Sequence, residues 1–199
     1  MKNIAFLVLA AGKSSRMNSI KQLEKINNKH LLEITLDKIK EINSKNIFCV
    51  LGANSDKIKS EISNKNIHFI ENKNFETGLS SSIVSGLTYF KKQQLNFDRV
   101  FVLLGDQPAI ETSYLKTMLN LSQKKKEIII ASSYEKKIGV PVIFPKKYFS
   151  NLLLIKGDKG AKEFINEKRS EVLCPKITTN FFDIDTKEDL SHFKKSILK

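Results

Sequence analysis

Residues 4–17 read IAFLVLAAGKSSRM, an apolar run that breaks into small, basic and hydroxyl-bearing residues. The apolar part, Ile4–Ala10, has the length and composition of a fully buried β-strand. After it, small residues around Gly12 let backbone N–H groups approach an anion, while Lys13 and Arg16 add positive charge. These features are typical of a strand that leads into a phosphate-binding loop.

Two well-known phosphate-binding motifs do not fit this stretch. A Walker-type loop, G-x-x-x-x-G-K-[ST], would need glycine at the position of Leu7, and the dinucleotide motif G-x-G-x-x-G would need it at Ser14. Two interpretations remain open. One is a different phosphate-binding loop, to which Ser14, Ser15 and Lys21 contribute donors and charge. The other is an ordinary turn with exposed basic residues.

Strand-like apolar runs recur along the chain and alternate with segments of helical periodicity. The runs are Ile4–Ala10, Ile47–Leu51, Ile67–Ile70, Arg99–Leu104, Glu127–Ser132 and Val140–Phe144. Apolar residues spaced three and four apart indicate helices around residues 31–42, 58–62, 83–90 and 115–121. This alternation predicts an α/β fold, a three-layer αβα arrangement with a mostly parallel sheet, in one domain over residues 1–199.

Ligands of such sheets bind at the carboxyl ends of the parallel strands. We therefore expect the site just after Ala10, Ile70, Leu104 and Phe144, where the sequence becomes small or polar.

A glycine and three serines, Gly78 and Ser80–Ser82, stand directly before a helical pattern. One serine is enough to cap a helix, so three provide additional hydroxyl and amide groups at its N-terminus, which suit a base, a ribose or a phosphate. A flexible capped turn is the alternative interpretation.

A carboxylate follows the central apolar run in VFVLLGDQP, residues 100–108. Asp106 stands at the mouth of this strand beside Gly105, a position that suits Mg²⁺, which takes one or two carboxylates together with substrate phosphates. The alternative role for Asp106 is that of a turn residue.

A second acidic cluster, DIDTKEDL at residues 183–190, strengthens the metal interpretation. We expect Asp185 or Thr186 to cap the last helix, which leaves Asp183 to face the metal with Asp106. Asp185 and Asn180 are the rival second ligands.

The composition narrows the class of partner. The formal net charge is +13, but only three of the 34 basic residues are arginine, the residue that nucleic-acid surfaces favour. We therefore expect solvated surface charge and a small anionic substrate, with no nucleic acid as partner.

No apolar run approaches the roughly 18 residues of a membrane span. Cys49 and Cys174 form no CxxC motif and are expected as thiols in the reducing cytoplasm.

Six motifs in this order resemble the MobA-like NTP transferase family, nucleotidyltransferases of the molybdenum-cofactor group with a GT-A-like modified Rossmann fold. The first, L-A-A-G-x-S-x-R-M followed by a lysine, is matched by residues 9–17 and Lys21. The others are GLSSS (78–82), GDQP (105–108), GVPVIF (139–144), GDKGA (157–161) and DIDTKEDL (183–190). Asn18 replaces a glycine of the family pattern, which requires a positive φ there, and Asn27-Asn28 is expected to make the turn before Leu31. Lys187 stands where the family has proline.

Among these enzymes the molybdenum cofactor cytidylyltransferases are the most similar. The resemblance implies transfer of CMP from CTP to the phosphate of molybdopterin, with release of pyrophosphate and with Mg²⁺ as cofactor. It implies catalytic roles for Arg16, Lys21 and Asp106, and metal binding by Asp106 and Asp183. The implied nucleotide-binding residues are Leu9, Ala10, Ala11, Gly12, Lys13, Ser14, Ser15, Arg16, Lys21, Gly78, Ser80, Ser81 and Ser82. The implied acceptor-binding residues are Gly139, Pro141, Gly157, Asp158 and Gly160.

Within this family, Ala11 favours a pyrimidine base, because the guanylyltransferase relatives carry glycine at the corresponding place. Transient contact with molybdoenzyme maturation partners is a further implication. Two alternatives stay open. One is a nucleotidyltransferase for a sugar phosphate or another small phosphate, and the other is a non-catalytic, basic binding protein of the same fold.

Overall fold

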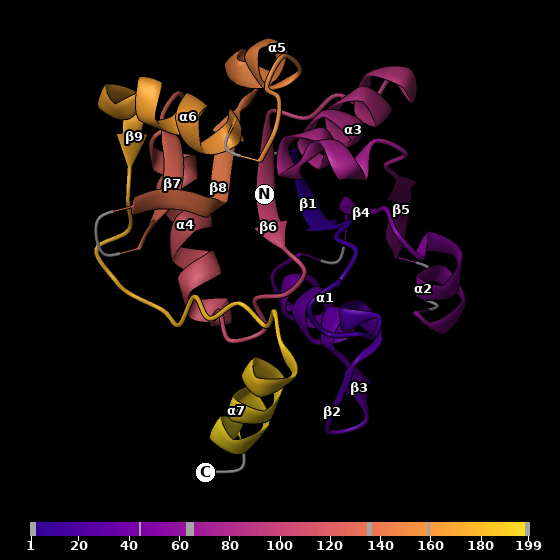
Figure 1. The fold of residues 1–199 in the computed structure, drawn as a ribbon. Helices are drawn as coiled ribbons and strands as arrows, with labels where there is room; N and C mark the ends of the chain where they lie inside the picture. The colour runs from indigo at the N-terminus through magenta and orange to yellow at the C-terminus, as the bar shows by residue number, and fades with distance from the viewer. Residues whose placement is uncertain (1–2, 44, 63–65, 135–136, 159, 198–199) are drawn as a thin grey trace.

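The computed structural model describes residues 3–43, 45–62, 66–134, 137–158 and 160–197. Its centre is a seven-stranded sheet with the order β5-β4-β1-β6-β8-β7-β9, and helices cover both faces (Figure 1). The strands are β1 (Ile4–Ala10), β4 (Ile47–Leu51), β5 (Ile67–Glu71), β6 (Arg99–Leu104), β7 (Ile129–Tyr134), β8 (Lys137–Pro145) and β9 (Val172–Leu173). The predicted α/β, three-layer arrangement with a mostly parallel sheet is confirmed.

The helices are α1 (Leu31–Ile42), α2 (Ser55–Glu61), α3 (Leu79–Lys92), α4 (Thr112–Lys124), α5 (Phe149–Leu152), α6 (Gly160–Glu167) and α7 (Lys187–Ile197). In the described part of the chain, none of them is long and apolar enough to cross a membrane. A small hairpin of β2 (Lys25–Ile26) and β3 (Lys29–His30) precedes α1. Asn27 and Asn28 turn it with φ values of 47° and 65°, as expected from the sequence.

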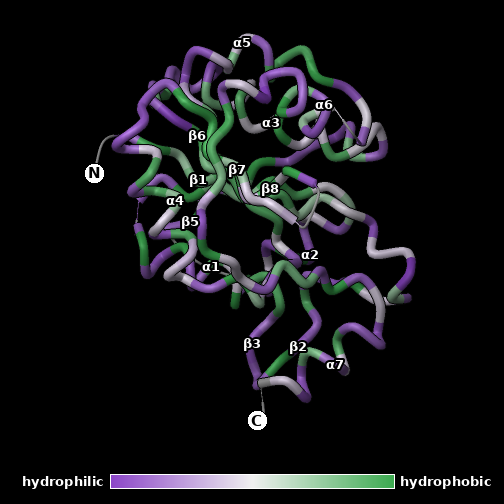
Figure 2. Tube along the Cα trace, turned by 90° about the vertical axis from the view of Figure 1, so that its left-hand side faces the viewer, coloured by the Kyte–Doolittle hydropathy of each residue, from purple (hydrophilic) through white to green (hydrophobic). Residues whose placement is uncertain are grey.

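The first strand is buried along its whole length because its alternating side chains enter two hydrophobic cores. Phe6 and Val8 pack with α1 and α4 on one face of the sheet, whereas Leu7 and Leu9 pack with α3 and α6 on the other. Figure 2 shows the hydrophobic residues concentrated along these central strands. A strand buried on both faces reads as a continuous apolar run, which is why β1 was recognisable from its sequence.

The direction of β8 differs from the expectation. It pairs with β6 in the antiparallel sense, so that Arg99 lies opposite Pro145 and Val102 opposite Val142. The carboxyl end of β8 therefore lies at the opposite edge of the sheet from Leu104, and the prediction of a site just after Phe144 is wrong. An apolar run indicates a buried strand but carries no information about the direction of that strand. Because β8 is antiparallel to β6, the beginning of β8 lies at the edge where β1 and β6 end.

Close packing between α3 and β1 gives a test of the fold. A Cβ atom at Gly86 would lie 2.5 Å from a methyl carbon of Leu7, whose side chain is fully buried. We expect Gly86→Val to lower the free energy of unfolding by about 1–3 kcal/mol, because overpacking forces side chains out of their preferred rotamers. Ser85→Ala on the same helix is the control and should change it by less than about 0.5 kcal/mol in chemical denaturation. Equal stability of the two variants would contradict this packing.

Candidate active site

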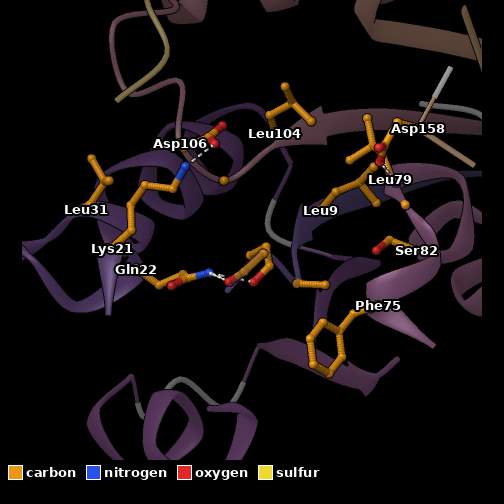
Figure 3. Close-up of a pocket in the computed structure, with 15 residues that line it drawn as sticks. Leu9, Lys21, Gln22, Leu31, Phe75, Leu79, Ser82, Leu104, Asp106 and Asp158 are labelled. Carbon is orange, nitrogen blue, oxygen red and sulfur yellow. Dashed lines mark hydrogen bonds and ion pairs between the residues drawn. The ribbon is translucent and has the colours of Figure 1, made fainter. Parts of the chain in front are cut away.

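A pocket of about 270 Å³ opens at the carboxyl ends of β1 and β6 (Figure 3). Its walls come from these two strand ends, from the segment that begins at Lys21, and from the loops before α3 and α6. The lining residues are Leu9, Ala10, Ala11, Gly12, Lys21, Gln22, Leu31, Phe75, Gly78, Leu79, Ser82, Leu104, Gly105, Asp106 and Asp158. Strand ends and loops that are far apart in sequence thus meet at the edge where the sequence predicted a ligand.

A second cavity of about 240 Å³ adjoins the first. It is lined by the loop of residues 12–16 together with Lys21 and Asp185. Gly12 and Lys21 line both cavities, so the two form neighbouring parts of one site. The second cavity is rich in cationic side chains and backbone amides, the groups that bind phosphates.

The loop between the two cavities is held in shape by its own hydrogen bonds. Ser14 has a positive φ of 58°, and its hydroxyl accepts the backbone N–H of Lys21 at 3.1 Å. The side-chain amide of Gln22 donates to the carbonyl oxygens of Ala10 and Gly12 at 2.8 and 3.2 Å. Asn18 has the positive φ that its place in the family pattern requires, 52°. Gln22, which is buried and positions the loop, was missed by the sequence analysis; its place directly after Lys21 was the only signal.

Lys21 joins two carboxylates at the centre of the site. Its Nζ lies 2.7 Å from Oδ2 of Asp106 and 2.8 Å from Oδ1 of Asp185, while Arg16 approaches the other oxygen of Asp185 at 2.9 Å. Burial alone would lower the pKa of Lys21, but Asp106 and Asp185 outweigh it and raise the pKa. In the same way, burial would raise the pKa of Asp185, but Lys21 and Arg16 hold it below its usual range. Both groups are therefore charged at neutral pH.

Asp183 lies in a different electrostatic environment. Burial and the negative charge of Asp106 raise its pKa to about 6, although a hydrogen bond from Gln107 at 2.8 Å partly offsets this. Oδ1 of Asp106 is buried and has no hydrogen-bond partner among the described residues. Two neighbouring carboxylates, one with an unpartnered oxygen, are hard ligands that fit a divalent cation. No group of three or more His, Cys, Asp or Glu residues suited to a metal occurs in the described part of the chain.

The rival ligands have other contacts. Asp185 is engaged by cations, and Oδ1 of Asn180 accepts the backbone N–H of Phe182. Thr186, one of the two predicted caps, is the one that caps α7: its hydroxyl accepts the N–H of Asp189, whose carboxylate accepts the N–H of Thr186. The geometry therefore favours Asp183 as the partner of Asp106.

The glycine and serines before α3 pack against the loop that precedes α6. Gly78 has a φ of 104°, and a Cβ there would lie 2.5 Å from the backbone carbon of Gly157. The N–H of Leu79 donates to Oδ1 of Asp158 at 3.1 Å, and the N–H of Ser80 donates to the carbonyl of Gly157 at 3.1 Å. A side chain at position 78 would separate the two loops, which explains the requirement for glycine.

The three serines have different environments. Ser82 lines the larger cavity, Ser81 donates to the carbonyl oxygen of Gly78, and the hydroxyl of Ser80 is buried with no hydrogen-bond partner among the described residues. Asn72, which is 1% exposed, donates to the hydroxyls of Ser81 and Ser82. Asn72 was also missed, and its signal was a polar residue directly after an apolar strand.

The residues assigned to the acceptor come from two parts of the chain, the loop before α6 and the strand β8. Gly157 and Asp158 lie beside the loop before α3, on the side of the site assigned to the nucleotide, and Gly160 packs near Ser80 at the start of α6. Gly139 and Pro141 lie on β8, and a Cβ at Gly139 would lie 3.7 Å from the ring of Tyr134. The hydroxyl of Tyr134 in turn lies 3.5 Å from the side-chain amide of Gln107, next to Asp183.

The sheet order and the loops gathered at its edge define a GT-A-like modified Rossmann fold. More narrowly, the chain belongs to the family of MobA-like NTP transferase domains, whose model matches residues 6–172. The family that the sequence motifs indicated is thereby confirmed.

Individual relatives are more distant. The bifunctional protein GlmU of Francisella philomiragia is 30% identical over 131 residues, which are 65% of this chain and 28% of that protein. Rv0371c from Mycobacterium tuberculosis superposes with a TM-score of 0.81 at 21% identity over 98% of both chains, and its manganese complex gives 0.78. The 4-diphosphocytidyl-2C-methyl-D-erythritol synthase of Anaerococcus prevotii gives 0.75 at 21% identity, covering 100% of this chain and 97% of that one. At these identities, the two solved proteins show the shared fold.

The burial of Asp183 and its repulsion by Asp106 predict a pH-dependent stability. The pKa of Asp183 rises from 3.8 to about 6 on folding, so its contribution is fully favourable below pH 3.8 and is lost as the pH rises through 6. With a chelator present at pH 7.5, the free energy of unfolding of Asp183→Asn should therefore be higher than that of the wild type by about 1 kcal/mol. This value is reduced to allow for screening of the charges by solvent. At pH 3.5 the two proteins should be equal.

Asp56→Asn is the matched control, because the side chain of Asp56 is fully exposed. Denaturant titrations between pH 3.5 and 8 measure both variants. A constant difference between Asp183→Asn and the wild type over this range would show that folding does not raise the pKa of Asp183.

Proposed function

We propose that this protein transfers CMP from CTP to the phosphate of molybdopterin and releases pyrophosphate. The observation that carries the proposal is the meeting of Lys21, Asp106 and the small-residue loop at one edge of the sheet, around two adjoining cavities. One cavity offers amides and cations for a polyphosphate, and the other offers apolar walls and an acidic side chain for a base.

The reaction needs positioning and charge neutralisation more than a covalent nucleophile. An oxygen of the acceptor phosphate forms a bond to the α-phosphorus while the bond between that phosphorus and the bridging oxygen of pyrophosphate breaks. Arg16 and Lys21, together with the amides of the 12–16 loop, stabilise the negative charge on the phosphates as it moves to the leaving group. The buried Gln22 donates hydrogen bonds to the carbonyl oxygens of Ala10 and Gly12. These bonds keep the carbonyl oxygens turned away from the phosphates.

Asp106 and Asp183 would hold a divalent cation, expected to be Mg²⁺, at the same edge. When bound, such a cation neutralises phosphate charge and polarises the bonds to the transferred phosphorus. With only two protein carboxylates in place, the remaining ligands would come from the nucleotide and from water, as is usual for Mg²⁺. The manganese complex of a protein with this fold is consistent with this assignment.

The proposed base site lies between the loops before α3 and α6. Asp158 lines the larger cavity, and its Oδ1 already accepts the N–H of Leu79, which fixes the carboxylate at the rim. A carboxylate can accept a hydrogen bond from the exocyclic amino group of cytosine but repels the carbonyl that uracil has at that position. We therefore assign Asp158 to reading the base instead of holding the acceptor.

Loss of the central carboxylate should stop the reaction. Asp106→Asn keeps the size of the side chain but removes the charge, so kcat should fall by about 10²–10³-fold or more while the fold stays intact. Asp37→Asn, on the surface of α1, is the control and should retain full activity. The assay follows pyrophosphate release with CTP, Mg²⁺ and molybdopterin. An Asp106 variant with near-normal kcat would refute the role assigned to Asp106, whereas absence of turnover in the wild type would favour a non-catalytic binding protein.

The identity of the base gives a second prediction. Asp158→Asn can donate to uracil as well as accept from cytosine, so the ratio of kcat/KM for CTP over UTP should fall about tenfold, the equivalent of roughly one hydrogen bond. Glu76→Gln is the matched control, because Glu76 lies at the same edge but pairs with Lys13 outside the larger cavity. An unchanged ratio in the Asp158 variant would remove Asp158 from the base site.

A second candidate is transfer of a nucleotide to a different small phosphate, such as that of a sugar or polyol. The structural similarity to the 4-diphosphocytidyl-2C-methyl-D-erythritol synthase of Anaerococcus prevotii favours this candidate, because the name of that protein describes a cytidyl group joined to a polyol. The nucleotide half of the site would be the same in both cases. The same assay with a panel of sugar and polyol phosphates beside molybdopterin separates the two candidates by the acceptor that gives turnover.

A further inference from the structure

A separate pocket of about 250 Å³, distinct from the two cavities of the candidate active site, lies at the opposite end of the sheet. It is formed by the start of β6, the end of β8 and the connection between α4 and β7. The lining residues are Asp98, Arg99, Lys126, Glu127, Pro145, Lys146 and Lys147. Arg99 is the first residue of β6 and Leu104 the last, so the length of this strand, roughly 20 Å, separates the pocket from Asp106.

The unusual feature of this pocket is a buried arginine. Arg99 is only 5% exposed, and its Nε is buried without a hydrogen-bond partner among the described residues. The ion pairs found in the described part of the chain do not include Arg99, although Asp98 and Glu127 line the same pocket. A buried guanidinium nitrogen without a hydrogen-bond partner is unfavourable, because it loses its hydration and gains no hydrogen bond in return.

Lysines surround this arginine. Lys146 donates to the side-chain carbonyl of Asn96 at 2.6 Å, and Lys147 pairs with Glu171 at 3.0 Å. Four cationic and two acidic side chains line the pocket, so its local charge is positive. Lysines that follow α4 also suit the negative end of the helix dipole, and by themselves they would not indicate a ligand. Arg99 belongs to a strand and has no such role.

We propose that this pocket binds a phosphate-type anion, either free or as the terminal group of a small metabolite. The guanidinium presents a planar fork of donors that matches the oxygens of a phosphate, and the neighbouring ammonium groups add compact positive charges. The acidic residues at the rim offer acceptors for hydroxyl groups next to the phosphate. The site is separate from the nucleotide site, and the inference does not depend on the proposed function.

A site-resolved titration tests the proposal. In ¹H–¹⁵N NMR spectra at constant ionic strength, added sodium phosphate should shift the amide signals of residues 98–99, 126–127 and 146–147 and reach saturation. The shifts should disappear in Arg99→Met, in which an apolar side chain of similar length replaces a buried cation and is not expected to unfold the protein. Arg99→Lys, which keeps the charge but loses the fork, should bind more weakly by at least about tenfold.

The controls separate this site from the other. Arg16→Met removes a cation of the 12–16 loop and should leave the phosphate-induced shifts at residues 98–99 unchanged. Lys146→Met keeps Arg99 but removes a neighbouring cation, so it should weaken phosphate binding at these residues. A parallel titration with sn-glycerol 3-phosphate shows whether the esterified form binds more tightly than free phosphate. Absence of saturation at these amides in the wild type, or equal shifts in Arg99→Met, would overturn the proposal and would indicate that Asp98 or Glu127 neutralises the arginine.

Discussion

One ammonium group, shared by two carboxylates, holds the functional edge of this molecule together. Lys21 is separated in sequence by 85 residues from Asp106 and by 164 residues from Asp185, yet its Nζ contacts both. Only 12% of its side chain is exposed, so these ion pairs are partly shielded from water and are stronger than ordinary surface pairs. The adjacent Gln22 fastens the loop that contains Gly12 to the same segment. The loop, the central strand and the C-terminal segment therefore meet at this one side chain.

The same contact explains how an acidic site can receive an anionic substrate. Asp106, Asp183 and Asp185 lie close together, and burial together with repulsion from the other two carboxylates raises the pKa of Asp183. In the ligand-free protein Lys21 and Arg16 offset much of this negative charge. In the proposed reaction Lys21 and Arg16 would turn part of their attraction to the phosphates, and a divalent cation held by Asp106 and Asp183 would supply the charge that neutralises these two carboxylates. The charges of the protein and substrate must balance as a set, because none of the carboxylates could face a polyphosphate alone.

Much of the fold followed from the sequence, since β1, β4 and β6 are buried on both faces and read as continuous apolar runs. The loops that lie at their carboxyl ends were also predictable, because parallel strands end at one edge. The direction of β8 was not, since an apolar pattern is the same read from either end. Gln22 and Asn72 were missed because their importance comes from tertiary hydrogen bonds to loops, and single polar residues carry no periodic signal. The hydrogen bond between Leu79 and Asp158 likewise depends on the path of the chain after β8.

The C-terminal segment has a structural role that its position at the end of the chain does not suggest. Met17, next to Arg16 at the end of the 12–16 loop, is fully buried in a small core with Ile184, Leu190 and Phe193. The backbone N–H of Ile184 also binds the carbonyl of Asp106. The family match ends at residue 172, so the C-terminal partners in these contacts, Ile184, Leu190 and Phe193, all lie beyond it. A fragment cut at that boundary would keep the recognisable family domain but lose two of the three clustered carboxylates and the apolar anchor of the loop, so the functional unit of this chain is longer than its family signature.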